Sequence, residues 1–346
     1  MNKQIAYING ISYYLPEKVL TNKELSQEHP EWSVEKISQK TGILQRHIAE
    51  ENEYSSDIAV RSIDIFFKGH TIRKSDIDFL LFCTQSPDYF LPTTACILQD
   101  RANLPKSCGA LDFNLGCSGY VYGLGLAKGL VETGQANNIL LVTSETYSKF
   151  IHQKDKSNKT LFGDASTVTL VTSQPNSDYF YARIEDFAYG TDGSGSEYLI
   201  VRNGSMKGNK KDGTDQFDEE GNFVRNDNNL YMDGKAIFNF TAFEIPPLIE
   251  QTLKKNNLSI DEVNLFVFHQ ANAYMLDFVR NRCNIPKEKF YISIQDVGNT
   301  VSSTIPIALK RAIEDKTVNS HTHNILLAGF GVGLSMGAVI LKLHKL

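Results

Sequence analysis

The sequence lacks the cysteine spacings on which metal sites and disulfide frameworks depend. Its 346 residues include five cysteines, Cys83, Cys96, Cys108, Cys117 and Cys283, and no two of them form a C-x-x-C pair. An odd number of widely separated cysteines fits neither a set of paired disulfides nor a zinc site. We therefore expect no metal, and free thiols of the kind found in the reducing cytoplasm.

An excess of one charge is also missing. The 35 lysines and arginines are matched by 40 aspartates and glutamates, which gives a formal net charge of −5. Nucleic acids are bound mainly through clustered basic side chains, so we expect no nucleic-acid partner.

Long hydrophobic runs are scarce as well. The first twenty residues contain no continuous apolar segment of the kind found in signal peptides. The longest uncharged apolar stretch, residues 325–341, is interrupted by four glycines and a serine. This pattern is typical of a strand, a loop and a second strand, so we expect no membrane span.

Apolar material for a sizeable core is present, with 41% hydrophobic residues in a chain long enough for about two structural units. Residues 77–82 resemble residues 263–268, and the sequence NILL occurs at both 138–141 and 324–327. Both pairs are 186 residues apart. The shared offset predicts a duplicated α/β unit with halves at 1–175 and 176–346, although strands of similar Ile and Leu content are an alternative explanation.

Within each half, strands and helices are expected to alternate. Continuous apolar runs at 79–83 and 138–143 predict strands that are buried on both faces, and 247–255 and 304–314 have helical spacing. Such alternation favours a mostly parallel sheet covered by helices. Residues 203–229 are rich in Gly, Asn, Asp and Lys and predict a long polar loop, either a lid or a solvated excursion.

Residues 110–119 lead from an apolar strand into a helix that ends near Gly134, and Cys117 lies where this helix begins. The free N–H groups and the dipole of a helix N-terminus should lower the pKa of the thiol and could hold an oxyanion. The helix carries glycines at 119, 123, 125 and 129. The offset pairs Cys117 with Ser303, so close packing of a second, equivalent helix would explain these glycines. A small buried side chain is the alternative role for Cys117.

Polar residues that a cysteine nucleophile needs follow two strands in the second half. His269 comes directly after the apolar run 265–268, and Asn299 lies in a Gly-Asn turn. The carboxyl ends of strands are where open α/β sheets place binding groups. A buried structural histidine and an ordinary turn are the alternatives. The glycine-rich segment 329–333 could offer N–H groups to an oxyanion.

Six motifs together give a specific resemblance. They are TGILQRHIA at 41–49, the turn at Cys117, LFGDAS at 161–166, HQAN at 269–272, GNTVSSTIPIAL at 298–309 and GFGVGLSMGA at 329–338. With these motifs in this order, the sequence resembles the β-ketoacyl-acyl carrier protein synthase III family of thiolase-like condensing enzymes. The resemblance implies a thiolase-like duplicated five-layer α-β-α-β-α fold and a homodimer.

The resemblance also implies a catalytic triad of Cys117, His269 and Asn299. An acyl-CoA starter would acylate Cys117, and malonyl-acyl carrier protein would then lose carbon dioxide and attack the acyl group. His269 and Asn299 would donate hydrogen bonds to the malonyl thioester oxygen. No metal or redox cofactor is needed for this chemistry.

Other roles follow from the same resemblance. The oxyanion hole would use the N–H groups of Cys117 and Val332, Phe330 would shield the site, and Leu91 would wall the acyl pocket at the dimer interface. Trp32 and Lys156 match the residues that hold the coenzyme A adenine, although Lys replaces an arginine there and loses its planar stacking surface.

The carrier-protein surface departs from the family pattern. Tyr274 stands where an arginine is usual, and a position near Asn239 also lacks its usual lysine. Acidic carrier proteins are recognised by basic patches, so other cations would have to compensate. The candidates for this docking role are Lys235, Arg280 and Arg282.

Three functions therefore remain open. The first is the condensation described above, in fatty-acid synthesis or in a specialised lipid, polyketide or glycan pathway. The second is transfer of an acyl group from Cys117 to an alcohol or amine without decarboxylation. The third is a non-catalytic partner subunit, which the intact triad argues against. Release of carbon dioxide from a malonyl thioester distinguishes the first from the second.

Overall fold

The computed structural model describes residues 4–176, 180–208 and 213–343. Over these ranges the chain forms a mixed α/β fold around a nine-stranded sheet with the order β13-β14-β15-β8-β1-β7-β6-β4-β5. The strands are β1 (Tyr7–Tyr14), β4 (Phe79–Cys83), β5 (Gly109–Phe113), β6 (Asn138–Glu145), β7 (Ala165–Thr172), β8 (Ala182–Thr191), β13 (Leu265–Phe268), β14 (Asn324–Gly331) and β15 (Ser335–Leu343). Short two-stranded pairs are β2 (Val19–Thr21) with β3 (Gln45–His47), β9 (Leu199–Ile200) with β12 (Tyr231–Met232), and β10 (Gln216–Phe217) with β11 (Phe223–Arg225).

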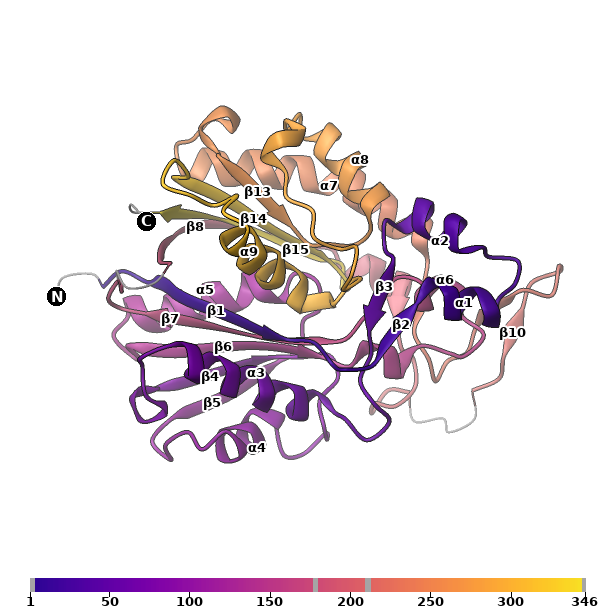
Figure 1. The fold of residues 1–346 in the computed structure, drawn as a ribbon, viewed down its shortest axis with the longest axis horizontal. Coiled ribbons are helices and arrows are strands. Elements are labelled where there is room, and N and C mark those ends of the chain that lie inside the picture. Colours follow the sequence, from indigo (N-terminus) through magenta and orange to yellow (C-terminus); the bar gives the residue numbers. More distant parts are fainter. Residues whose placement is uncertain (1–3, 177–179, 209–212, 344–346) are drawn as a thin grey trace.

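The helices divide the molecule into layers (Figure 1). Helices α3 and α4 cover the outer face of the strands from the first half, α7 and α8 cover the outer face of β14, β15 and β8, and α5 and α9 lie between the two groups of strands. The expected thiolase-like five-layer arrangement is therefore confirmed. The helices are α1 (Asn22–Glu28), α2 (Val34–Thr41), α3 (Ser55–Gly69), α4 (Thr94–Arg101), α5 (Gly119–Glu132), α6 (Lys156–Lys159), α7 (Gly234–Lys255), α8 (Ala273–Arg282) and α9 (Thr304–Glu314).

The repeat seen in the sequence persists in the pairing of strands. β4 runs parallel to β6 with Phe79 opposite Ile139, and β13 runs parallel to β14 with Leu265 opposite Ile325. Both residues of the second pair lie 186 positions after those of the first. The two half-sheets therefore share one register. The boundaries 1–175 and 176–346 remain a prediction.

The match between Cys117 and Ser303 is wrong by one residue. α5 begins at Gly119 with Ser118 as its N-cap, and α9 begins at Thr304 with Ser303 as its N-cap. The two caps have nearly the same backbone angles, with φ of −86° and −85°. Ser118 is thus the counterpart of Ser303, because the offset changes slightly between the strands and the helices.

The glycines of α5 are also explained differently from what was expected. A Cβ atom at Gly123 would lie 2.5 Å from Leu141 of β6, and one at Gly125 would overlap the hydroxyl of Tyr189 on β8. Side chains of β6 and β8, rather than α9, therefore leave no room for a larger residue than glycine at these two positions of α5. At Gly129 an added Cβ would meet nothing within 4 Å.

Helix α7 is much longer than the predicted 247–255. It begins at Gly234, where the Asp233 carboxylate accepts a hydrogen bond from the N–H of Ala236 at 2.9 Å, and it continues through Pro246 and Pro247. Proline is common in the first turn of a helix because its missing N–H has no acceptor to satisfy there. Packing of α7 on β8 and β15 holds the helix through both prolines here.

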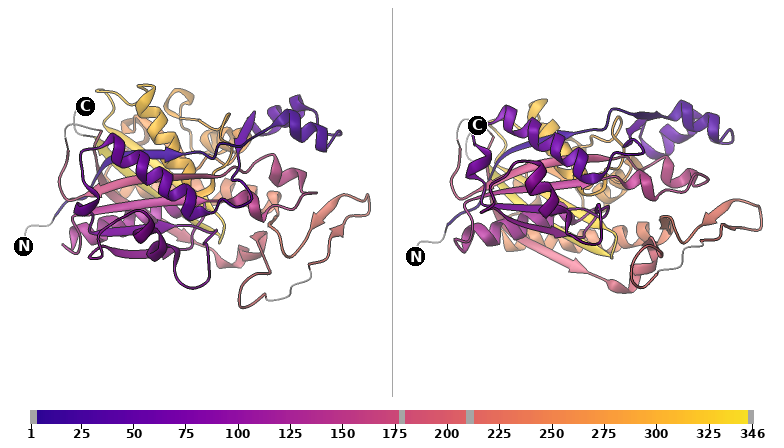
Figure 2. Two further views of the ribbon diagram at one scale, coloured as in Figure 1. Left: turned by 60° about the horizontal axis from the view of Figure 1, so that its bottom comes forward. Right: turned by 90° about the horizontal axis from the view of Figure 1, so that it is seen from below.

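Residues 203–229 contain the hairpin β10–β11, which projects at the same end of the molecule as α1 and α2 (Figure 2). Residues 209–212 lie outside the described residues. The Phe223 ring stacks on His152, with ring centroids 4.4 Å apart and an interplanar angle of 9°. The segment is therefore more than a solvated excursion. Across the described ranges, no helix has the length and hydropathy needed to cross a membrane.

Candidate active site

Cys117 lies in the connection from β5 to α5 and is 6% exposed. The end of β14 packs directly against it, since a Cβ atom added at Gly331 would lie 2.8 Å from both Cβ and Sγ of Cys117. The backbone N–H groups of Val332 and of Cys117 itself interact with the thiol. These are the two N–H groups for which the family resemblance predicts the role of an oxyanion hole.

Burial raises the pKa of the Cys117 thiol to about 12, although the two N–H groups act to lower it. The expected fall in the pKa of this thiol is therefore wrong for the free protein. α5 begins two residues later, at Gly119, and loss of solvent around the sulfur outweighs the helix dipole and the hydrogen bonds. The side chain of Cys117 is therefore a neutral thiol in the free protein at physiological pH.

His269 directly follows β13, and its N–H donates to the carbonyl of Ala328 at 2.8 Å. The imidazole is buried, and its Nδ1 lies 2.7 Å from Oγ1 of Thr304 at the start of α9. Burial lowers the pKa of His269 to about 3. The ring is therefore neutral at physiological pH and can accept a proton only when a partner gives one up.

Asn299 is held through its backbone by the LFGDAS segment. Its N–H donates to Leu161 at 2.8 Å, and its carbonyl accepts from the N–H of Gly163 at 3.0 Å. The side-chain Oδ1 accepts from the N–H of Val301 at 3.0 Å. Because the oxygen is occupied, the Nδ2 amide group is the part of the side chain that can donate into the cavity.

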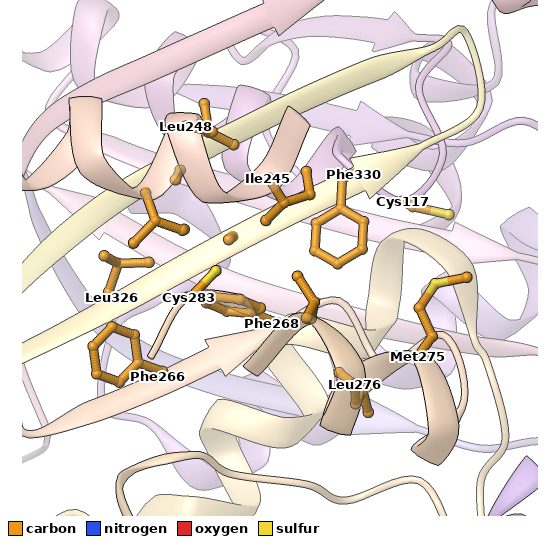
Figure 3. Close-up of a cluster of buried hydrophobic side chains, with 14 of the residues drawn as sticks. Cys117, Ile245, Leu248, Phe266, Phe268, Met275, Leu276, Cys283, Leu326 and Phe330 are labelled. Atoms are coloured by element: carbon orange, nitrogen blue, oxygen red, sulfur yellow. The ribbon is translucent and has the colours of Figure 1, made fainter. Parts of the chain in front are cut away.

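Cys117, His269 and Asn299 meet at one cavity of about 680 Å³, and Phe330 lines it beside them. The Phe330 ring is edge-on to the imidazole of His269, with centroids 5.9 Å apart. Figure 3 shows Phe330 next to Cys117, with Ile245 and Met275 in the same apolar cluster. A small number of polar groups in a mainly apolar cavity suits an acyl thioester.

Trp32 and the hairpin residues Phe223 and Val224 also line the cavity. The ammonium groups of Lys40 and Lys36 lie 4.8 Å and 5.6 Å from the centre of the Trp32 ring. Sequence reasoning missed both lysines. Their signal was the spacing of four and eight residues from Trp32, because residues four apart share a face of the helix that follows the tryptophan.

The other candidate ligand residues lie away from the cavity lining. Lys156 forms an ion pair with Glu31 at 2.8 Å, and Leu91 is 87% exposed. Lys235 and Arg282 are exposed, whereas Arg280 donates to Asp277 at 2.8 Å and to the carbonyl of Ile285 at 2.9 Å. In the described part of the chain, no three His, Cys, Asp or Glu side chains are grouped so as to hold a metal ion.

Glu145, at the end of β6, is a buried carboxyl group that the sequence analysis did not single out. It accepts hydrogen bonds from the N–H of Gln85 at 3.0 Å and from the hydroxyl of Ser302 at 2.8 Å. Burial raises its pKa to about 8. An acidic residue shortly after the apolar run 138–143 could have indicated Glu145, because open sheets place polar groups at the carboxyl ends of their strands.

The raised pKa of Glu145 predicts a fall in stability with increasing pH. Between about pH 4.5 and pH 8 the folded protein keeps a proton that the unfolded chain has released, so the free energy of unfolding should decrease across this window. Replacing Glu145 by Gln should remove a decrease on the order of a few kcal/mol. Urea unfolding at pH 5 and pH 8.5 measures this, with the exposed Glu219→Gln as control. An unchanged pH slope in Glu145→Gln would contradict the assignment.

Comparison with known proteins identifies the family of the chain. A family model described as 3-oxoacyl-[acyl-carrier-protein (ACP)] synthase III matches residues 111–193, and one described as the C terminal of the same enzyme matches residues 253–343. A β-ketoacyl-[acyl-carrier-protein] synthase III from Clostridium perfringens (strain 13 / Type A) is 34% identical over 334 residues, which cover 96% of this chain and 98% of the relative.

Solved structures give the same result. A 3-oxoacyl-(acyl-carrier-protein) synthase III is 43% identical with a TM-score of 0.93, over 98% of this chain and 99% of the other. The priming β-ketosynthase from the R1128 polyketide biosynthetic pathway is 25% identical with a TM-score of 0.84, over 99% and 97% of the two chains. The fold, the six motifs and the near-complete match to these relatives agree, and the chain belongs to the 3-oxoacyl-acyl carrier protein synthase III family of condensing enzymes.

Proposed function

We propose that this protein joins an acyl-CoA starter to malonyl-acyl carrier protein by decarboxylative Claisen condensation. The observation that carries the proposal is the meeting of Cys117, His269 and Asn299 at one apolar cavity, with the N–H groups of Cys117 and Val332 at the thiol. A thiol nucleophile, a neutral imidazole and preorganised N–H donors are the groups that acyl transfer through a covalent intermediate needs.

In the first half-reaction the thiol of Cys117 attacks the thioester carbonyl. The thiol and the imidazole of His269 are both neutral, so the proton leaves the sulfur as the new carbon–sulfur bond forms. The N–H groups of Cys117 and Val332 stabilise the oxyanion of the tetrahedral intermediate. Coenzyme A then leaves, and the acyl chain remains on the enzyme beside Phe330.

In the second half-reaction the malonyl thioester oxygen accepts hydrogen bonds from Asn299 Nδ2 and from His269. These bonds stabilise the enolate that forms as carbon dioxide leaves. The enolate carbon attacks the acyl group on Cys117, and the sulfur leaves as the 3-oxoacyl product forms. Each step uses groups of this chain alone.

The deciding experiment measures carbon dioxide from carboxyl-labelled malonyl-acyl carrier protein after Cys117 has been acylated with a short acyl-CoA. Condensation predicts one carbon dioxide and one 3-oxoacyl thioester per acyl group consumed. Acyl transfer to an alcohol or amine predicts an acylated enzyme that leaves the malonyl thioester intact, and that result would contradict the proposal. The starter is identified by offering a panel of acyl-CoA thioesters, since the structural relatives include a priming enzyme from a polyketide pathway.

We place the adenine end of coenzyme A against Trp32. Trp32 is 9% exposed and lines the cavity, and Lys40 supplies a nearby positive charge for a phosphate. Lys156 would reach this ligand only by leaving Glu31.

Replacing Trp32 by Ala is expected to raise the KM for acyl-CoA by roughly tenfold while leaving kcat within a factor of about two, since ring stacking contributes about 1–3 kcal/mol. Lys40→Gln is a second variant, which should also raise the KM for acyl-CoA. The control substrate is an acyl-pantetheine, which lacks the nucleotide, and neither variant should change its KM. An equal effect on both thioesters in either variant would contradict the adenine placement.

We also propose that two copies associate along β5. This strand ends the order of the large sheet, and Leu111 on it is 46% exposed. An open strand edge with an apolar side chain is suited to pairing with a second chain. Phe90 and Leu91 are also exposed, just before α4, which packs on β5. They would be covered in such a dimer, where Leu91 would wall the acyl pocket.

The acceptor surface is proposed to lie near Lys235 and Arg282, with Arg280 contributing only if it leaves Asp277. Tyr274 and Phe243 are also exposed, at 65% and 66%. Weakening of carrier-protein binding by salt would support ionic docking, because surface ion pairs are screened. The cytoplasmic location remains a prediction.

A further inference from the structure

Thr304 carries a hydroxyl group that the proposed reaction does not yet use. It is 3% exposed, at the first turn of α9, and its Oγ1 lies 2.7 Å from Nδ1 of His269 and 3.0 Å from the carbonyl oxygen of Val301. The hydroxyl therefore lies between an imidazole nitrogen and a backbone acceptor. It has only one proton to share between them.

The backbone acceptor decides where that proton goes. The carbonyl of Val301 can only accept, so a hydroxyl that donates to it offers its lone pairs to His269. This arrangement makes two hydrogen bonds, from Nδ1–H to Thr304 and from Thr304 to Val301. The opposite arrangement, with the hydroxyl donating to Nδ1, makes only one. Because buried polar groups are costly when unsatisfied, the first arrangement is favoured.

Val301 is held firmly for this role. Its φ is +55°, which is unusual for a β-branched residue, and its N–H donates to Oδ1 of Asn299 at 3.0 Å. One residue thus offers its N–H to the catalytic amide and its carbonyl to the threonine that contacts the catalytic imidazole. The orientation of Thr304 is therefore linked to that of Asn299.

We propose that Thr304 is a positioning residue that keeps a proton on Nδ1 of His269 throughout the reaction, so that Nε2 faces the cavity as the proton acceptor. The inference rests on the proposed function, in which His269 serves Cys117. Thr304 occupies Nδ1, and the backbone carbonyl of Val301 also interacts with the imidazole, so the exchange of protons with the reacting groups takes place at Nε2.

The protons balance in this scheme. In acylation the S–H bond of Cys117 breaks, its proton moves to Nε2 of His269, and coenzyme A leaves as a thiolate that takes a proton from solvent. The imidazolium then has an Nε2–H that donates to the malonyl thioester oxygen. After carbon dioxide leaves and the new carbon–carbon bond forms, the Cys117 thiolate takes the proton back from Nε2.

The test combines a spectrum with single-turnover kinetics. With nitrogen-15 labelled histidine, and with His269→Gln used to assign the signal, the free enzyme should show a protonated Nδ1 and an unprotonated Nε2 for His269. Thr304→Val should shift the population toward the other tautomer and slow acylation of Cys117 by about 10- to 100-fold. Thr304→Ser, which keeps the hydroxyl, should restore both.

The matched control is Thr300→Val. Thr300 is equally buried four residues away, and its hydroxyl has no hydrogen-bond partner among the described residues, so its removal should change neither tautomer nor rate. A protonated Nε2 in the free wild-type enzyme would overturn the proposal, as would equal slowing by Thr304→Val and Thr304→Ser. A wild-type enzyme that never acylates Cys117 would instead refute the proposed function, because the spectrum can be read without substrate.

Discussion

The Cys117→Ala variant should gain no acyl mass when it is incubated with acyl-CoA thioesters, and its condensation rate should fall by roughly 10³-fold or more. The thiol is the only group at the inner end of the cavity that this mechanism uses to form a covalent intermediate. Alanine fits the space of Cys117, so the fold should be kept. Intact-protein mass spectrometry after a short incubation measures the mass gain directly.

Cys283→Ala provides the control for this experiment. Cys283 is also buried, and burial raises its pKa to about 12 as well, but it lies outside the cavity lining. This variant should be acylated at the wild-type rate. An acyl mass that persists in Cys117→Ala, or disappears in Cys283→Ala, would show that another side chain carries the acyl group.

Gly331→Ala is expected to slow acylation by about 100-fold without removing any reacting group. The new methyl group would lie 2.8 Å from both Cβ and Sγ of Cys117, closer than real Cβ contacts allow, so the thiol or the end of β14 has to move. A displacement of about 1 Å at a reacting atom is enough for a loss of this size. Single-turnover release of coenzyme A measures the rate, and circular dichroism checks the fold.

Gly190→Ala is the matched substitution on β8, which is separated from β14 by β15 in the sheet. Its methyl group would also meet a close neighbour, but that neighbour is the far end of the flexible Met336 side chain, which can rotate away. This variant should acylate within about twofold of wild type, on the reasoning that the reacting atoms are not displaced. Equal rates for Gly331→Ala and wild type would mean that the contact with Cys117 is not tight in solution.

The sequence supported the fold because its signals were local and repeated. The runs at 79–83 and 138–143 predicted strands that match β4 (Phe79–Cys83) and most of β6 (Asn138–Glu145). Cys117, His269 and Asn299 could be singled out because each follows a strand or precedes a helix, positions that a parallel sheet brings to one edge. Their catalytic roles remain a prediction. Their joint position at one cavity follows from the duplicated arrangement.

The features that were missed depend on burial and on contacts between distant segments. The sign of the pKa shift at Cys117 could not be read from a helix start, because desolvation is set by β14 and by the rest of the cavity. The placement of Phe223 in the cavity wall depends on its stacking against His152, 71 residues earlier in the chain. The start of α7 at Gly234 was hidden because two prolines imitate the beginning of a helix.

The two N–H groups at the thiol have a consequence for how such a protein can change over time. One belongs to Cys117, beside α5, and the other to Val332, after β14, and they come from different copies of the duplicated unit. A change in the backbone of one half alone would move one of the two N–H donors away from the oxygen that both would bind. Substitutions in one half are therefore constrained by the shape of the other, and the contact between Gly331 and Cys117 is the point at which the two halves limit each other.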